Sequence, residues 1–154
     1  MKKTILLFLI IILTGCQLSN KKVIDEYYLT YNDNDIRLNT LFSNTFSTIG
    51  EYLNYRIEES SISNNTSNHY EYTNFEIETY FDNNIEKIAA ITLTDENIQT
   101  TESVRIYDSK EKMINVYGDG YQKIGNIYIY KQKDTNLSFT LENDIIVNIR
   151  YYIE

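Results

Sequence analysis

The hydrophobic and polar positions of the chain follow one pattern twice. Residues 36–50 begin with a branched apolar residue, an arginine and a second apolar residue, continue with apolar residues at helical spacing and stop at Gly50. Residues 104–118 repeat this pattern without a gap, 68 positions later, and stop at Gly118. Apolar residues every three or four positions predict a helix with one buried face. We therefore predict two short helices at corresponding places in a repeat, each ended by a glycine in a left-handed conformation.

Each predicted helix has a capping residue and three apolar positions. Thr40 and Asp108 precede the helices and can accept hydrogen bonds from the first free amide groups. Asp108 and Glu111 also have the spacing of a capping box. The side chains expected to be buried are Phe42, Phe46 and Ile49 in the first helix, and Met113, Ile114 and Tyr117 in the second.

Alternating residues after each helix predict an antiparallel meander of about three strands. Residues 77–81 and 137–141 alternate in the same way, and a turn of Asn and Asp residues follows each of them. Long last strands are predicted at 85–94 and 145–153. The predicted fold class is therefore α+β, with short helices packed on one face of an antiparallel sheet in two tandem helix-plus-meander units. A chance alignment of two generic units is the alternative.

The first unit has two segments without a counterpart in the second. Residues 23–31 could form a short helix or a first strand, and their apolar spacing fits the helix slightly better. A turn of Asn and Asp residues follows at 32–35. Residues 58–68 are rich in Ser and Asn and predict an inserted loop, with His69 beside it. We place the first unit at residues 23–102 and the second at 103–154.

The first sixteen residues follow a different pattern. Two lysines precede an unbroken apolar run of nine residues at 5–13, and Leu13-Thr14-Gly15-Cys16 closes it. Nine residues fit the apolar core of a signal peptide, whereas a membrane-spanning helix needs about 20. The segment resembles the signal peptide and lipobox of bacterial lipoproteins. The resemblance implies removal of residues 1–15, cleavage between Gly15 and Cys16, and a diacylglyceryl group on the Cys16 sulfur.

This resemblance sets the expected location of the protein. A lipidated Cys16 carries fatty acyl chains such as palmitate, and two acyl chains together suffice for stable anchoring. We expect a mature chain on the extracytoplasmic face of the cell membrane, with residues 16–22 as lipidated cysteine and tether. The 154 residues less the 15-residue leader leave 139, which is enough for one domain or two small subdomains.

Composition excludes several classes of partner and site. The leader holds two lysines and no acidic residue, so 12 basic residues face 22 acidic ones in the remaining chain. Nucleic acids and anionic headgroups are bound by basic patches, so neither is an expected partner. Cys16 is the only cysteine, which excludes a disulfide within the chain. The fifteen tyrosines accompany many Ile, Asn and Lys residues, which is typical of an AT-rich genome.

Residues 103–118 resemble the helix-start motif of small envelope modules, the SmpA/OmlA lipoproteins and the β-lactamase-inhibitor-protein group. Ser103 and Tyr107 stand where that motif has glycine, while its apolar positions, the Asp108-Ser109 cap and the closing Gly118 are kept. The resemblance implies helices on one face of an antiparallel sheet, as a tandem pair. Its members mostly bind other proteins or scaffold envelope assemblies, and none of their contact residues can be carried over.

The sequence predicts no catalytic site, no metal site and no cofactor. His69 is the only histidine, and its position predicts an exposed loop residue. Zinc would need several His or Cys ligands. Glu76 and Glu78 alternate with apolar residues, which places them on the solvated side of a strand rather than in an acid pair. The acidic turn at 32–35 lacks the glycine of a calcium loop.

The remaining candidate is a binding face. Strict alternation along 145–153 puts Ile146, Arg150 and Tyr152 on one side of the last strand. Together with Tyr128 and Tyr130 of a neighbouring strand, Arg150 and Tyr152 would form a patch of the residue types that dominate binding hot spots. The alternative is that these tyrosines only border the core.

Together these patterns predict a membrane-anchored extracytoplasmic lipoprotein that acts as a non-catalytic binding or envelope-interaction module. Its partner would be a protein or an envelope polymer. The alternative is an inhibitor or immunity lipoprotein that blocks a specific enzyme or toxin, because an acidic surface suits a basic target.

Overall fold

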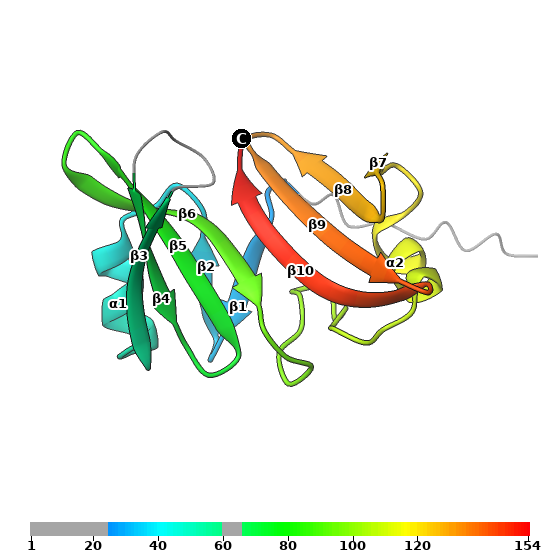
Figure 1. Ribbon diagram of the computed structural model, residues 1–154, viewed down its shortest axis with the longest axis horizontal. Coiled ribbons are helices and arrows are strands. Elements are labelled where there is room, and N and C mark those ends of the chain that lie inside the picture. The colour runs from blue at the N-terminus through cyan, green and yellow to red at the C-terminus, as the bar shows by residue number, and fades with distance from the viewer. Residues whose placement is uncertain (1–24, 60–65) are drawn as a thin grey trace, which may run out of the picture.

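The protein is mostly β-structure (Figure 1). The computed structural model describes residues 25–59 and 66–154. Among these, 54% lie in strands or isolated β-bridges and 13% in helices. The predicted leader at 1–15 and the predicted lipidated cysteine and tether at 16–22 lie outside the described residues, so both remain predictions.

The described chain contains ten strands and two helices. The first half comprises β1 (Tyr28–Tyr31), β2 (Asn34–Arg37), α1 (Phe42–Ile49), β3 (Asn54–Glu59), β4 (Thr66–Glu71), β5 (Phe75–Asp82) and β6 (Ile85–Leu93). The second half comprises α2 (Lys110–Tyr117), β7 (Gln122–Ile124), β8 (Ile127–Gln132), β9 (Thr135–Glu142) and β10 (Ile145–Ile153). The helix favoured for residues 23–31 is wrong for the described part, and the strand alternative is correct, because β1 pairs with β2 in a hairpin.

Eight strands form one antiparallel sheet in the order β3-β4-β5-β6-β10-β9-β8-β7. Each half contributes four consecutive strands that run from an edge to the centre. The halves meet where residues 149–152 of β10 pair with residues 90–93 of β6. Each meander therefore has four strands rather than about three, because β3 and β7 add a strand at each outer edge.

The same backbone contacts occur at the start of both helices. In the first half, the Asn39 amide donates to the Ile88 carbonyl at 2.8 Å, and the Ile88 amide donates to the Thr40 carbonyl at 3.0 Å. In the second half, the Tyr107 amide donates to the Ile146 carbonyl at 2.8 Å, and the Ile146 amide donates to the Asp108 carbonyl at 2.9 Å. Asn39 and Tyr107 are 68 positions apart, and both have positive φ, 57° and 70°. The boundary between the units at residue 102 stays a prediction.

The α+β fold class predicted from the sequence is wrong, because the fold is mostly β. Each helix has only eight residues. Eight residues give a helix about 12 Å long, whereas eight strands about 4.8 Å apart span about 34 Å. Two such helices cannot form a layer over the sheet.

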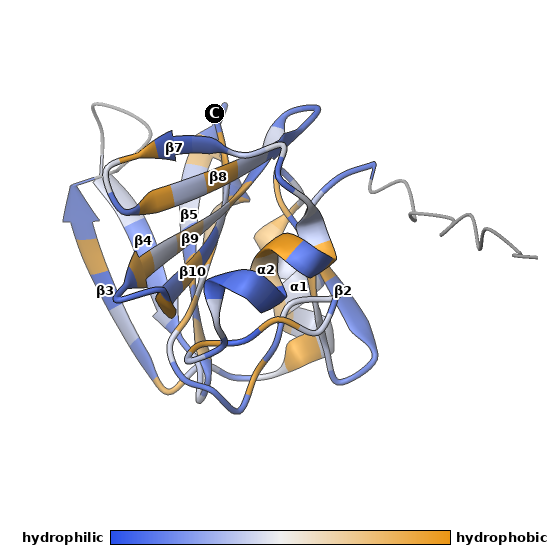
Figure 2. Ribbon diagram, turned by 90° about the vertical axis from the view of Figure 1, so that its right-hand side faces the viewer, coloured by the Kyte–Doolittle hydropathy of each residue, from blue (hydrophilic) through white to orange (hydrophobic). Residues whose placement is uncertain are grey.

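Most of the core opposite the sheet comes from segments that are not helical. Figure 2 shows β2, α1 and α2 on the same side of the sheet. Leu29 and Ile36 of the β1–β2 hairpin are fully buried there, as is Val104 of the segment between β6 and α2. Of the helical residues expected inside, Phe42, Met113 and Tyr117 are buried, and Ile49 and Ile114 are partly buried. The prediction for Phe46 is wrong, since 36% of it is exposed.

The C-terminal ends of the two helices agree with the sequence-based prediction better than their N-terminal ends. The N-caps are Leu41 and Ser109, each one residue later than predicted, and only Ser109 caps through its side chain. Thr40 and Asp108 instead form side-chain bonds with the residue three positions before them.

Gly50 and Gly118 end the helices, as predicted. Their φ values of 88° and 87° are positive, but their ψ values of −165° and −172° differ from the predicted left-handed cap. This is a backbone region that essentially only glycine adopts. Each glycine donates its amide to the carbonyl four residues earlier.

Candidate functional site

The structure separates the four residues of the predicted binding face. Tyr128 and Tyr130 lie on the core side of the sheet, where both are buried. Arg150 and Tyr152 point to the opposite side, which we call the open face. The pairing explains this, because Tyr152 and Lys131 both stand opposite Asn136 of β9 and so share a side. The tyrosines of β8 alternate with Lys131 and therefore point the other way.

The surroundings of Tyr128 and Tyr130 are those of structural residues. The Tyr130 hydroxyl donates to the Gly118 carbonyl at 2.7 Å, and its ring contacts Tyr117 at 5.3 Å between centroids. Burial raises the pKa of Tyr130. Tyr128 has the ammonium groups of Lys110 and Lys123 near its ring at 5.5 and 5.1 Å. Hydrogen bonding from Lys123 first, and then hydrogen bonding from Lys110 and the charges of both lysines, lower the pKa of Tyr128.

A β-bulge in β10 changes which residues reach the core. The register shifts between Ile146 and Asn148, so alternation breaks at this point. Ile146 is therefore fully buried together with Ile149 and Tyr151. The sequence-based placement of Ile146 beside Arg150 is wrong.

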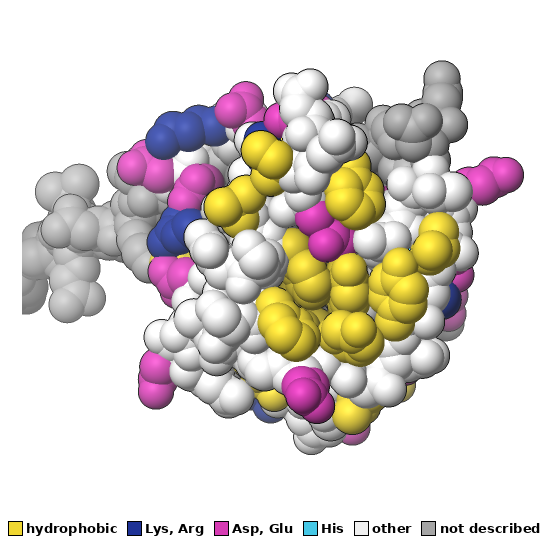
Figure 3. Space-filling model, turned by 90° about the vertical axis from the view of Figure 1, so that its left-hand side faces the viewer, with side chains coloured by type: hydrophobic (Ala, Val, Ile, Leu, Met, Phe, Trp, Pro, Cys, Tyr) yellow, Lys and Arg dark blue, Asp and Glu magenta, His cyan; other side chains and the backbone are white. Residues whose placement is uncertain are grey.

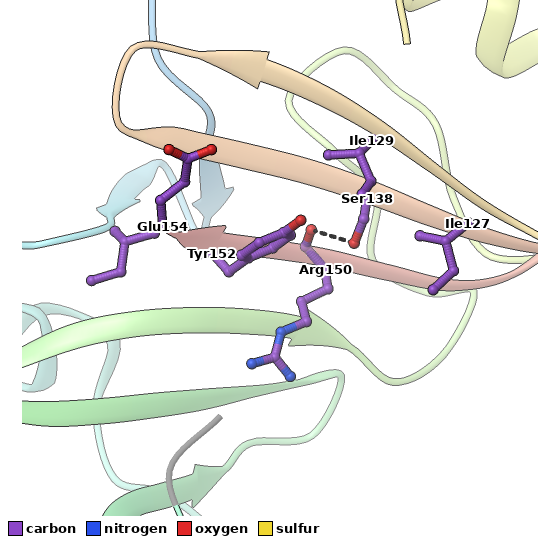
Figure 4. Close-up of a pocket in the computed structure, with 7 residues that line it drawn as sticks. Ile127, Ile129, Ser138, Arg150, Tyr152 and Glu154 are labelled. Carbon is purple, nitrogen blue, oxygen red and sulfur yellow. Dashed lines mark hydrogen bonds between the residues drawn. The ribbon is translucent and has the colours of Figure 1, made fainter. Parts of the chain in front are cut away.

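The open face contains a hollow of about 460 Å³ between β8, β9 and the end of β10 (Figure 4). It is lined by Ile127, Ile129, Ser138, Arg150, Tyr152, Ile153 and Glu154. The isoleucines give it apolar walls, and an ion pair between Lys131 and Glu154 lies at its rim. Burial raises the pKa of Tyr152, which keeps its hydroxyl neutral. Such a hollow can accept an apolar or aromatic group and offer polar contacts beside it.

Arg150 is fixed at one side of this hollow. Its guanidinium donates to a carboxylate oxygen of Glu78 at 2.6 Å, and its backbone carbonyl accepts a bond from Ser138 at 3.3 Å. The Glu78 side chain is only 4% exposed, so the charge of Arg150 balances a buried carboxylate. Figure 4 shows the guanidinium directed away from β8, toward the strands of the first meander. Arg150 thus links the two halves of the sheet.

A second polar cluster on the open face was missed by the sequence analysis. Nδ1 of His69 lies 2.7 Å from Glu76, and its Nε2 lies 3.0 Å from the Ser67 hydroxyl. Arg56 of β3 donates to Glu76 at 2.5 Å and to Glu58 at 2.6 Å. The predicted loop at 58–68 is wrong for its described ends, because residues 58–59 belong to β3 and residues 66–68 to β4, while 60–65 lie outside the described residues. The prediction of an exposed His69 is also wrong, since it is 7% exposed.

Ser67, His69 and Glu76 have the order of bonds found in a hydrolase triad. Ser67 has no exposed surface, so its hydroxyl cannot reach a substrate in this conformation. The cluster instead connects three neighbouring strands, because Arg56 reaches across β4 to Glu76 of β5. Its role in this structure is to hold the outer strands of the first meander together.

Comparisons with known protein families, curated proteins and solved structures found no match. The residues described by the structure contain no group of three or more His, Cys, Asp or Glu side chains that could hold a metal ion. None of the helices within the described ranges is long and apolar enough to cross a membrane. The assignment of function therefore depends on the geometry of the open face and on the sequence.

Proposed function

We propose that the protein is a membrane-anchored extracytoplasmic lipoprotein that acts as a non-catalytic binding module. The hollow on the open face carries the proposal. Its volume of about 460 Å³ is in the range of ordinary binding pockets. Tyr is enriched among residues that dominate binding energy, and Tyr152 lines the hollow beside Arg150, whose guanidinium is held by Glu78. The apolar walls favour an apolar side chain of a protein partner over a polysaccharide.

Two features of the sequence support the other parts of the proposal. The lipobox at 13–16 supports anchoring through Cys16. Ser103 and Tyr107 stand where the SmpA/OmlA and β-lactamase-inhibitor-protein group has glycine, and their φ values of 69° and 70° are those that favour glycine. A backbone turn of this kind supports the resemblance to a group of binding and scaffolding modules.

The anchoring is tested by Cys16→Ser. We expect this variant to incorporate no fatty acid and to accumulate with its leader uncleaved, because the thiol is the proposed site of lipid attachment. Metabolic labelling with a radioactive fatty acid measures the first effect, and gel mobility the second. Labelling of Cys16→Ser equal to that of the unaltered chain would contradict the proposal.

The binding face is tested by affinity capture from the envelope of the native cell, followed by titration of the captured protein. Tyr152→Ala and Ile127→Glu alter the hollow, and we expect each to weaken binding about tenfold or more, as for a hot-spot residue. Phe81→Ala is the matched control, because Phe81 is 55% exposed at the β5–β6 turn and does not line the hollow. Equal affinity of all three variants would place the binding site elsewhere.

The alternative function is that of an inhibitor or immunity lipoprotein. The acidic composition favours it, since the whole chain has a formal net charge of −8 and opposite charges accelerate association with a basic target. Such a target need not be made by the same cell. Binding that falls steeply as salt rises supports this alternative, whereas weak salt dependence supports the apolar hollow.

A further inference from the structure

The two outer edges of the eight-stranded sheet are unequal. β7 is three residues long and carries Lys123 at its centre. A short edge strand and a lysine on it both protect a sheet edge against pairing with another chain. β3 is six residues long and contains no proline, glycine or lysine. Among the described residues, no strand pairs with the outer side of β3. The backbone amides and carbonyls on that side can therefore pair with another strand.

The surface around β3 is also unusually apolar. Of the eleven large hydrophobic side chains exposed among the described residues, six lie on α1, on β3 or in the segments next to them in the chain. A seventh, Ile85 at the start of β6, lines a hollow together with Leu41 and Phe46. We call this group the β3 surface, and it consists of Leu41, Phe46, Tyr52, Leu53, Tyr55, Ile57 and Ile85. Figure 3 shows hydrophobic side chains gathered on this side of the molecule.

The aromatic part of the β3 surface is continuous. The Tyr52 ring lies 6.0 Å from that of Phe46 and 6.2 Å from that of Tyr55. Tyr55 also contacts the core ring of Tyr70 at 5.2 Å, so the exposed rings are held in place by buried ones. Ile57 points to the same side as Tyr55 and is 58% exposed. A contiguous apolar surface of this kind usually marks an interface.

We propose that β3 pairs with β3 of a second copy of this chain in an antiparallel arrangement centred on Ile57. This register places Arg56 opposite Glu58 of the second copy, and the two-fold symmetry repeats the pair in the other direction. Opposite charges that face each other across strands stabilise the pairing. Within one chain the Arg56 guanidinium already lies 2.6 Å from Glu58, so the dimer brings two arginines and two glutamates together.

The charges select a second copy rather than an unrelated strand. A two-fold interface must be complementary to itself, and the sequence Arg56-Ile57-Glu58 meets this condition, with a positive charge on one side of its centre and a negative charge on the other. The side chains of Tyr55 and Ile57 lie on the same side of the strand. Ile57 would meet its counterpart at the two-fold axis, and Tyr55 would lie diagonally beside Ile57 of the second copy. This interface is separate from the hollow on the open face.

Disulfide cross-linking tests the register. In the proposed dimer the two copies of residue 57 face each other with Cβ atoms about 4.5 to 5.5 Å apart, which a small shift brings into disulfide range. The experiment uses the full chain in detergent with Cys16→Ser, so that no natural thiol remains. We expect Ile57→Cys to form a disulfide-linked dimer on a non-reducing gel. The control is Ile124→Cys on β7, which is 55% exposed. Equal cross-linking of the two variants would overturn the proposal.

Exchanging the charges of Arg56 and Glu58 tests whether the strand that pairs with β3 is β3 of a second copy. Arg56→Glu puts acidic residues opposite each other in both places, and we expect cross-linking through residue 57 to fall about tenfold or more. Glu58→Arg, at a carboxylate that is 51% exposed, puts arginines opposite each other with the same effect. Mixing the two differently tagged variants restores both ion pairs, so we expect mixed dimers in excess of either homodimer.

Two results of the charge experiment would overturn the proposal. One is undiminished cross-linking of both single variants, and the other is a mixture that forms no mixed dimer although each variant is folded. Circular dichroism and the melting temperature establish folding, which matters most for Arg56→Glu because Arg56 also binds Glu76. If that variant does not fold, Glu58→Arg alone decides the outcome, since it leaves the Arg56–Glu76 ion pair in place and undiminished cross-linking by it would overturn the proposal.

Discussion

Gly50 offers a clean measurement of backbone strain in this protein. Its φ of 88° and ψ of −165° lie where residues with a side chain are rarely found. A Cβ atom added at Gly50 would meet no atom within 4 Å, so Gly50→Ala causes no clash. Its cost is therefore the backbone strain alone, about 1 to 3 kcal/mol. The lower entropy of the unfolded alanine chain offsets about 0.4 to 1 kcal/mol of this.

The expected net effect of Gly50→Ala is a loss of about 1 to 2 kcal/mol in the free energy of unfolding, which corresponds to a fall of roughly 3 to 8 °C in Tm. Urea titration followed by tyrosine fluorescence measures it, because the chain has no tryptophan. Gly120→Ala is the control, since Gly120 also has no atom within 4 Å of an added Cβ but does not have positive φ. If Gly50→Ala and Gly120→Ala are equally stable, the strain at Gly50 does not exist.

Two further predictions concern the core. Burial raises the pKa of Tyr27 and Tyr72 to about 12 from an ordinary value of 10.0. Above pH 10 the unfolded chain therefore loses protons that the folded chain keeps. The free energy of unfolding should fall between pH 10 and about 12 by up to about 1.4 kcal/mol per pH unit for each tyrosine. Urea midpoints measured across this pH range test the prediction, and a constant midpoint would contradict the burial of the two hydroxyls. Met113 is fully buried in α2, so Met113→Ala should cost about 2 to 5 kcal/mol. Its neighbour Ile114 is only partly buried, so Ile114→Ala should lower the free energy of unfolding clearly less in the same assay.

Local signals in the sequence predicted the turns and the helix ends. The turns at 83–84 and 143–144 lie between paired strands, and their Asn and Asp residues all have positive φ, between 50° and 66°. Gly50 and Gly118 end the helices because their backbone conformation needs glycine. These features depend on one or two residues, which is why a single sequence reveals them.

Features that depend on pairing between distant strands were not predictable in this way. Residues 66–71 have the composition of a loop, yet they form β4 because β3 and β5 pair on both sides and the bonds of His69 stay within the sheet. The sides of β10 depend on a bulge that leaves no mark in the sequence. The position of Tyr130 in the core depends on the register of β8 against β9. Context of this kind regularly overrides the propensity of a strand.

The unequal lengths of β3 and β7 limit how large an assembly of this protein can become. A sheet with two open edges can add copies at both ends, and repeated addition produces a fibre. Here only the six-residue edge can pair, while the three-residue edge with its lysine cannot. Growth by edge pairing is then complete at two copies. Lengthening β7 and replacing Lys123 by an apolar residue would remove this limit and turn a finite dimer into the repeating unit of a filament.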